Sequence, residues 1–226
     1  MTANEMYNNF QLEYDRVASD AAKGWLPEEV AWFINSYSSD LLRIKTESSD
    51  NAKRQSYIFP FKRSQILIQS SDQTGATGPS SVLFEIPSDY PGRSEKEVVK
   101  WINCDFTSTV TPVTDDEYFS LNIDETKASS VLELRRLLMS RPSNSENLIE
   151  LFLPKGSNLV VDEYLITYIR EPRLVVIDLD NPDDQVNSEY PANKHYEVIR
   201  GAVLYALEAA ADSRLQTFPV KPINFN

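Results

Sequence analysis

The chain has 226 residues with 34 acidic and 22 basic side chains, and its formal net charge at pH 7 is −12. This acidity argues against broad wrapping of nucleic acid, because such binding uses Lys and Arg to displace the counterions of the phosphates. Hydrophobic residues make up 41% of the chain, which argues against disorder throughout. No apolar run reaches the length of about 18 residues that a membrane-spanning helix needs. The single cysteine, Cys104, excludes an internal disulfide and a thiolate metal cluster.

The beginning of the chain predicts a pair of helices. Thr2 and Glu5 have the spacing of a capping box, and apolar residues then recur at helical spacing, which predicts a helix over about residues 3–20. Pro27 suits the first position of a second helix, over about residues 27–45. A short connection between two amphipathic helices indicates an antiparallel αα-hairpin.

The middle of the chain has the short, β-branched and aromatic runs that are typical of strands. We expect strands over residues 57–59, 66–68, 82–86, 99–107 and 174–179. Residues 131–138 fit either a strand or a helix. Residues 148–153 and 159–169 flank a Pro-Lys-Gly-Ser-Asn segment, and this pattern predicts a β-hairpin.

The end of the chain returns to a helical pattern over about residues 192–212, with an apolar face broad enough to pack on the N-terminal helices. The tail after Arg214 contains Pro219 and Pro222 and is expected to be extended. It carries four apolar side chains that suit a docking arm: Phe218, Val220, Ile223 and Phe225.

Together these patterns predict an α+β fold, in which the N-terminal αα-hairpin and the C-terminal helix form a helical bundle with a β-rich central insertion. The expected divisions are a helical hairpin at 1–50, a β-rich region at 51–190, a helix at 191–213 that packs on the first two, and an extended arm at 214–226.

Charge is distributed unevenly along the sequence. Residues 51–70 contain four basic residues and no acid, namely Lys53, Arg54, Lys62 and Arg63. Residues 171–190 are strongly acidic and include Asp180, Asp183 and Asp184. Opposite patches on one subunit suit association between copies, although two solvated surfaces explain them equally well. These seven residues and the apolar residues of the arm are the candidate interface residues.

The residue types of catalytic and metal sites do not form a recognisable pattern. His195 is the only histidine, and no Gly-x-Ser-x-Gly motif accompanies it, so a capping or interface role is the better interpretation. The carboxylates at 115–117 match no Ca²⁺ loop, and the glycines at 75 and 78 lack the Lys-Ser/Thr ending of a phosphate-binding loop. We therefore expect no catalytic residue, no cofactor, no bound metal and no enzymatic activity.

Three stretches resemble a known family when they are taken together. Residues 1–16 with 28–35, the segment YLITYIREP at 164–172, and the segment HYEVI at 195–199 with the apolar positions after it are similar to the opening, a middle segment and the closing helix of head-to-tail adaptor proteins of podovirus-type phages, especially the crAss-like phages. The three stretches occur in the same order as in that family and span nearly the whole chain.

The resemblance implies a structural subunit of an oligomeric ring, expected to be dodecameric, in the neck or tail of a bacteriophage. Such a ring connects the portal protein to the tail and extends the DNA exit channel, and it is assembled in the cytoplasm of the bacterial host. The implied partners are other copies of the chain, the portal protein and adjacent neck or tail ring proteins. DNA would pass through the lumen without sequence-specific binding, and no membrane is involved.

Two other interpretations remain open at this point. The chain could be another virion structural protein, such as a minor capsid or tail-attachment protein, which differs from a neck ring only by its place in the particle. It could also be a hydrolase of unknown type with scattered carboxylates. A ring seen by native mass spectrometry would separate the first interpretation from the enzyme.

Overall fold

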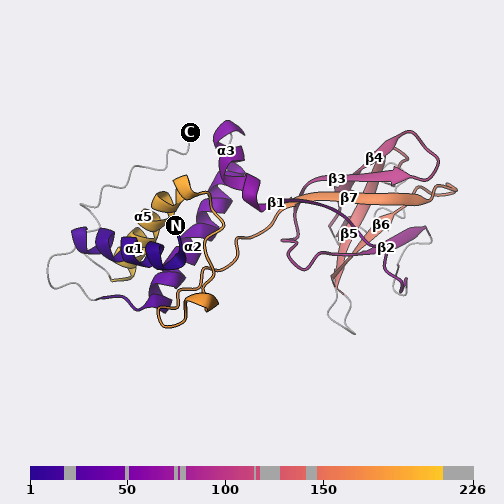
Figure 1. Ribbon diagram of the computed structural model, residues 1–226. Coiled ribbons are helices and arrows are strands. Elements are labelled where there is room, and N and C mark those ends of the chain that lie inside the picture. Colours follow the sequence, from indigo (N-terminus) through magenta and orange to yellow (C-terminus); the bar gives the residue numbers. More distant parts are fainter. Residues whose placement is uncertain are drawn as a thin grey trace. The chain divides into compact units, whose positions relative to one another are not determined.

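The computed structural model describes residues 1–17, 24–48, 51–73, 76, 80–114, 116–117, 128–140 and 147–210. The chain divides into two compact units (Figure 1). One unit, the helical unit, combines Met1–Phe61 with Glu171–Asn226, and the other, the sheet unit, is Lys62–Arg170.

The fold is α+β, but the prediction of a helical bundle with a β-rich insertion is wrong. The described residues contain four α-helices, and these do not dominate the structure. Seven strands form one curled, mixed sheet, a half-barrel, which encloses a hydrophobic core of its own. The error arose because the strand runs are short and weak one by one, whereas their pairing, which sequence does not display, builds the largest element of the molecule.

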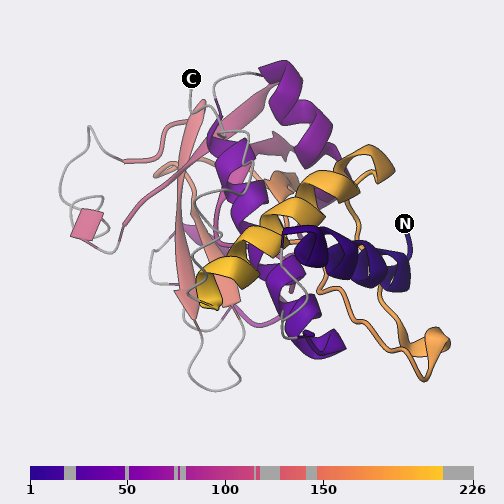
Figure 2. The same cartoon turned by 90° about the vertical axis from the view of Figure 1, so that its left-hand side faces the viewer.

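The helices of the helical unit are α1 (Ala3–Val17), α2 (Pro27–Glu47), α3 (Asn51–Ile58) and α5 (His195–Ala209). Helix α5 packs against both α1 and α2 (Figures 1 and 2). The predicted capping box is confirmed, since the Thr2 amide donates to the Glu5 carboxylate at 2.8 Å and the Glu5 amide donates to the Thr2 hydroxyl at 3.2 Å. Pro27 opens α2 as predicted.

Aromatic rings form much of the core of the helical unit. The rings of Phe10 and Phe33 lie 6.3 Å apart and nearly parallel, which joins α1 to α2. Gly201 of α5 lies directly against the ring of Tyr37, and a Cβ atom built on it would be 2.0 Å from Cζ of that ring. This glycine therefore sets how closely α5 approaches α2.

Two predicted strands of the helical unit are absent. Residues 57–59 belong to α3 and to the 3₁₀ turn Phe59–Phe61 that follows it. Tyr57 is buried here and its hydroxyl donates to the carboxylate of Glu197 in α5, so tertiary contact overrides the local β propensity. Residues 174–179 pair with other described residues only through an isolated bridge, Val176 with Val186.

The strands of the sheet unit are β1 (Lys62–Ile66), β2 (Ser81–Glu85), β3 (Ser94–Trp101), β4 (Thr107–Pro112), β5 (Glu133–Ser140), β6 (Asn147–Phe152) and β7 (Val161–Ile169). Their order across the sheet is β1-β7-β3-β4-β5-β6-β2 (Figure 1). Strands β4 and β5 are parallel and all other neighbours are antiparallel.

The segment after β1 curls the sheet by reaching from one edge to the other. The amide of Leu67 donates to the carbonyl of Tyr164 in β7 at 2.8 Å. The amide of Ser70 then donates to the carbonyl of Leu83 in β2 at 2.9 Å. Large side chains on the inner face fill the space that the curled sheet encloses, among them Trp101, Tyr164 and Ile149.

Two details of the predicted strands are corrected. Residues 99–107 are not one strand, because the chain turns after Trp101, where Asn103 has a positive φ of 59°, and then begins β4. The expected hairpin on either side of residues 154–158 does not form, since β6 pairs with β2 and β5 whereas β7 pairs with β1 and β3. The ambiguous segment after residue 131 is strand β5.

Candidate functional site

The four basic candidate residues fall into both units. Lys53 and Arg54 belong to α3, where the side chain of Lys53 is outside the described part and Arg54 is half-buried. Lys62 and Arg63 are adjacent, exposed residues of β1. The Nζ atom of Lys62 lies 2.9 Å from a carboxylate oxygen of Glu95, so this cation already has a partner within its own chain.

The three acidic candidates share one exposed loop of the helical unit. Asp183 and Asp184 end the 3₁₀ turn Pro182–Asp184, and Asp180 precedes it. An apolar strip, defined as Leu174, Val176 and Leu179, leads into this loop with its side chains exposed. Val175 and Ile177, which alternate with Leu174 and Val176, are buried, so residues 174–177 have one anchored face and one exposed apolar face, and Leu179 lies beyond this alternation. Sequence reasoning noticed the acids but missed the strip.

The arm residues Phe218, Val220, Ile223 and Phe225 lie outside the described residues, as do residues 18–20 of the first predicted helix, Asp115 and the glycines at 75 and 78. The docking-arm hypothesis therefore stays a prediction. In the described part of the chain, no group of His, Cys, Asp or Glu side chains is arranged to hold a metal ion.

His195, the only candidate for a histidine base, is buried at the first residue of α5. Its Nε2 atom lies 2.7 Å from the carbonyl oxygen of Tyr190, which fixes the proton on Nε2 because a carbonyl can only accept. Burial lowers the pKa of His195, and the hydrogen bond to Tyr190 opposes that effect only in part. The imidazole is thus held neutral as a structural donor.

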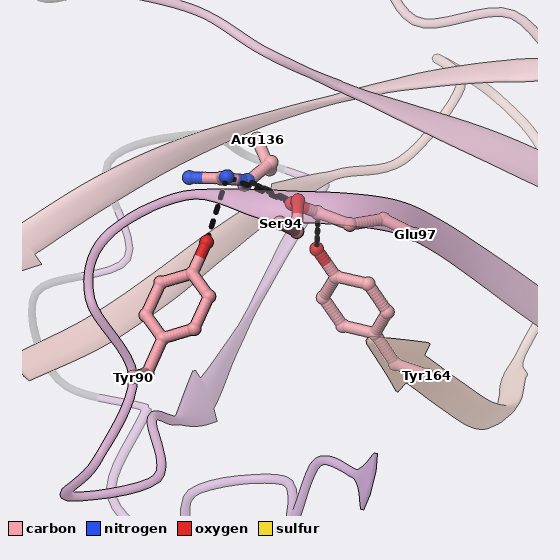
Figure 3. Close-up of polar contacts among 5 residues, drawn as sticks. All are labelled: Tyr90, Ser94, Glu97, Arg136 and Tyr164. Carbon is pink, nitrogen blue, oxygen red and sulfur yellow. Dashed lines mark hydrogen bonds and ion pairs between the residues drawn. The ribbon is translucent and has the colours of Figure 1, made fainter. Parts of the chain in front are cut away.

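The most densely bonded polar group among the described residues lies inside the curled sheet and was not foreseen. Arg136 of β5 and Glu97 of β3 are 2% and 5% exposed, respectively. The Nε atom of Arg136 donates to both carboxylate oxygens of Glu97 at 3.0 and 3.1 Å, and Nη2 donates to one of them at 2.7 Å (Figure 3). Two buried ions of opposite charge offset their loss of hydration only when they lie this close together and further hydrogen bonds satisfy them.

Three hydroxyl groups complete this network. Tyr164 of β7 and Ser94 of β3 donate to the carboxylate of Glu97, and Nη2 of Arg136 donates to the hydroxyl of Tyr90 at 3.1 Å (Figure 3). Burial raises the pKa of Tyr164 far above its usual range, and the charge of Glu97 adds to this effect. Burial alone would lower the pKa of Arg136, but the hydrogen bonds and charge of Glu97 raise it. The carboxylate therefore accepts from neutral tyrosine and from a guanidinium that stays charged.

A pocket of about 690 Å³ opens onto this network from the side of β3 and β4. Its lining includes Glu97 and Arg136 with the exposed residues Arg93 and Lys96. Sequence reasoning missed both the network and the pocket, because Glu97 and Arg136 are distant in sequence and stand among other charged residues. The one available signal was alternation, since Glu97 has the same parity as the apolar Val99 and Trp101 and so belongs to the inner face.

Comparisons with known proteins add no family to this description. No protein-family model matches the chain, and a search of curated proteins finds no significant match. Among the described helices, none combines the length and apolar character that are needed to cross a bilayer.

Proposed function

We propose that the chain is a non-enzymatic structural subunit of an oligomeric ring, dodecameric in its complete form, in the neck or tail of a tailed bacteriophage. In this role it connects the portal protein to the tail and extends the DNA exit channel. The observation that carries the proposal is the resemblance of three stretches, at 1–35, 164–172 and 195–208, to head-to-tail adaptor proteins, in the same order along the chain.

The apolar strip supports assembly between copies. Exposed apolar side chains that are gathered in one extended segment, and bordered by charged residues, have the composition of an interface core with a polar rim. In this chain the rim consists of Asp180, Asp183 and Asp184. A closed ring requires two unlike faces on each subunit, and an acidic, apolar loop can serve as one of them.

The exposed basic pair in β1 is proposed for the second of these unlike faces. Lys62 and Arg63 would meet acids of the neighbouring subunit, with Asp180, Asp183 and Asp184 as the proposed partners. Lys62 already contacts Glu95, so a neighbouring acid would compete with this ion pair. Replacement of both basic residues by Glu should then weaken assembly, and unchanged rings in that double variant would exclude the pairing.

The ring is tested directly by native mass spectrometry and negative-stain imaging of the purified chain. We expect closed rings, which Leu174→Ser combined with Val176→Ser should convert to small species. Leu132→Ser with Val160→Ser is the matched control, since these exposed apolar residues belong to the sheet unit. A protein that stays monomeric at every concentration that can be measured without precipitation would contradict the ring.

The role of a DNA channel predicts how the chain responds to free DNA. A subunit with a net charge of −12 should not bind free duplex DNA tightly, because phosphate repulsion keeps a moving duplex from stalling. Tight, salt-sensitive binding would argue against the channel.

The tail after Arg214 is proposed to dock on the portal, on the next ring or on a neighbouring copy, so its deletion should leave a folded subunit that assembles poorly into particles.

A further inference from the structure

The pocket of the sheet unit lies where two neighbouring strands separate. Strands β3 and β4 pair only between residues 98–100 and 107–109. Beyond these pairs, and within the described part of the chain, residues 94–97 of β3 have a strand partner only in β7, and residues 110–112 of β4 have one only in β5. The pocket of about 690 Å³ is lined by both of these half-paired segments, so it is bordered by main chain that has no described strand partner on the pocket side.

Arg136 presents an unused donor to this pocket. Arg136 as a residue is 2% exposed, and its Nε and Nη2 atoms are occupied by Glu97 and Tyr90. The Nη1 atom makes no hydrogen bond to any described residue, and Figure 3 shows this terminal nitrogen pointing away from Glu97. Nη1 is a charged donor, and such a donor binds an anionic acceptor more strongly than a neutral donor does.

The rim of the pocket adds positive charge that is not neutralised. Arg93 and Lys96 are exposed, and neither forms an ion pair with a described residue. The two acids beside them are already engaged, Glu95 with Lys62 and Glu97 with Arg136. On a chain that carries a net charge of −12, this local excess of positive charge selects an anionic partner.

We propose that this pocket binds an extended acidic segment of a partner protein. The main chain of the segment pairs with residues 94–97 of β3, and its carboxylates lie against Nη1 of Arg136 and the side chains of Arg93 and Lys96. Strand addition supplies affinity through the backbone, and side chains at alternate positions supply specificity. The unpaired strand edges favour a peptide over a small free acid, which could use only the charges. This inference goes beyond the proposed ring and does not depend on it.

The experiment uses the full chain and a fluorescently labelled heptapeptide of alternating Glu and Val, blocked at both ends. Fluorescence anisotropy should show saturable binding that weakens with salt. The same peptide with Gln in place of every Glu should bind at least about tenfold more weakly, since it lacks the charges. A third peptide, N-methylated on alternate amides, should also bind more weakly, because it cannot complete the edge of β3.

Variants of the protein locate the site. Arg93→Ala combined with Lys96→Ala should weaken binding about tenfold and leave the fold intact, because both residues are exposed. Lys155→Ala, which removes a similar exposed charge from a turn of the same unit outside the pocket lining, is the matched control and should bind as the parent protein does. Arg136→Lys keeps the charge and should weaken binding further, and if it does not fold, the rim variants decide.

The proposal is overturned if the Glu and Gln peptides bind equally or if the rim variant matches Lys155→Ala. Equal binding of the N-methylated peptide would exclude pairing with β3. Displacement of the labelled peptide by free glutarate at concentrations as low as those of unlabelled peptide would show a small-acid site and would also overturn the peptide assignment.

Discussion

The two units of the chain handle buried polar groups in opposite ways. In the sheet unit, every buried polar side-chain atom of the described residues has a hydrogen-bond partner, and the Glu97 carboxylate alone accepts from Arg136, Tyr164 and Ser94. In the helical unit, the buried Oγ of Ser38 and Nδ1 of His195 have no hydrogen-bond partner among the described residues. The sheet unit should therefore depend strongly on a few polar residues, whereas the helical unit should depend on packing and respond to pH.

The strongest test of this difference between the units is to remove one member of the buried ion pair. Arg136→Met leaves the Glu97 carboxylate buried without its counter-ion, and we expect a loss of about 3–5 kcal/mol in the free energy of unfolding of the sheet unit. Hydrogen–deuterium exchange with mass spectrometry measures this loss, because it resolves β3, β5 and β7 from the helices. Protection of α2 and α5 should change far less.

A second variant separates the charge from the loss of packing. Arg136→Met combined with Glu97→Gln removes both charges, so it should recover part of the stability that Arg136→Met loses. If the double variant is no more stable than the single one, then the cost comes from the volume and shape of Arg136 rather than from an unpaired carboxylate.

The packing of the helical unit is tested at Gly201. Gly201→Ala places a methyl group 2.0 Å from Cζ of Tyr37, in a core that cannot yield easily. Strain should exceed the gain in helix propensity and give a net loss of about 2 kcal/mol, measured by urea unfolding followed at α2 and α5. Gly24→Ala is the control, since a Cβ there meets nothing within 4 Å. Equal stability of the two variants would contradict the tight contact.

The two units also differ in how much of their fold could be predicted from the sequence. The starts of α1 and α2 were predictable because Thr2, Glu5 and Pro27 act on their own neighbours. The sheet was not, because its order joins β1 to β7 and β2 to β6, across most of the unit. Helix α3 was missed because Tyr57 is held by Glu197, a residue far along the chain.

In the candidate site, too, features set by neighbouring residues could be predicted and features set by distant residues could not. Charge counts located the acidic loop and the basic pair of β1, since both are exposed and contiguous in sequence. The pair of Glu97 and Arg136 was hidden because its meaning depends on strand register, which places both residues on the inner face. A single Glu or Arg in a strand is expected to be exposed unless the strand pairing is known to bring it to a partner of opposite charge.

The pH response of the helical unit has a definite sign. His195 is held neutral, with Nε2 bonded to Tyr190 and Nδ1 buried without a partner in the described part of the chain, and its pKa is lowered. The unfolded chain, whose histidine titrates near 6.5, therefore binds a proton more readily than the folded chain does. Stability should be full above this pH and should fall as the pH falls through 6.5 toward the folded pKa.

The measurement is urea unfolding of the helical unit between pH 7 and pH 5, above the range in which most carboxylates titrate. His195→Gln keeps a donor for Tyr190 and removes the titrating group, so its stability should change less over the same range. The nearest charges that affect His195 are the N-terminal amine and Glu5, and these are unchanged in the variant. A parent protein as insensitive to pH as the variant would rule out this role of His195.

The smallest expected effect concerns the edge of the sheet. Lys62 and Glu95 form an ion pair at 2.9 Å, but their side chains keep 38% and 22% of their surface exposed. Solvent screens such a pair, so Lys62→Ala should cost at most about 1 kcal/mol, measured by exchange in β1 and β7. Exchanging the two charges, with Lys62→Glu and Glu95→Lys together, should restore that small loss while it reverses the charge that β1 presents. If assembly uses Lys62, the exchanged variant is as stable as the parent but forms fewer rings. Equal ring formation by the two proteins would assign Lys62 to the sheet unit alone.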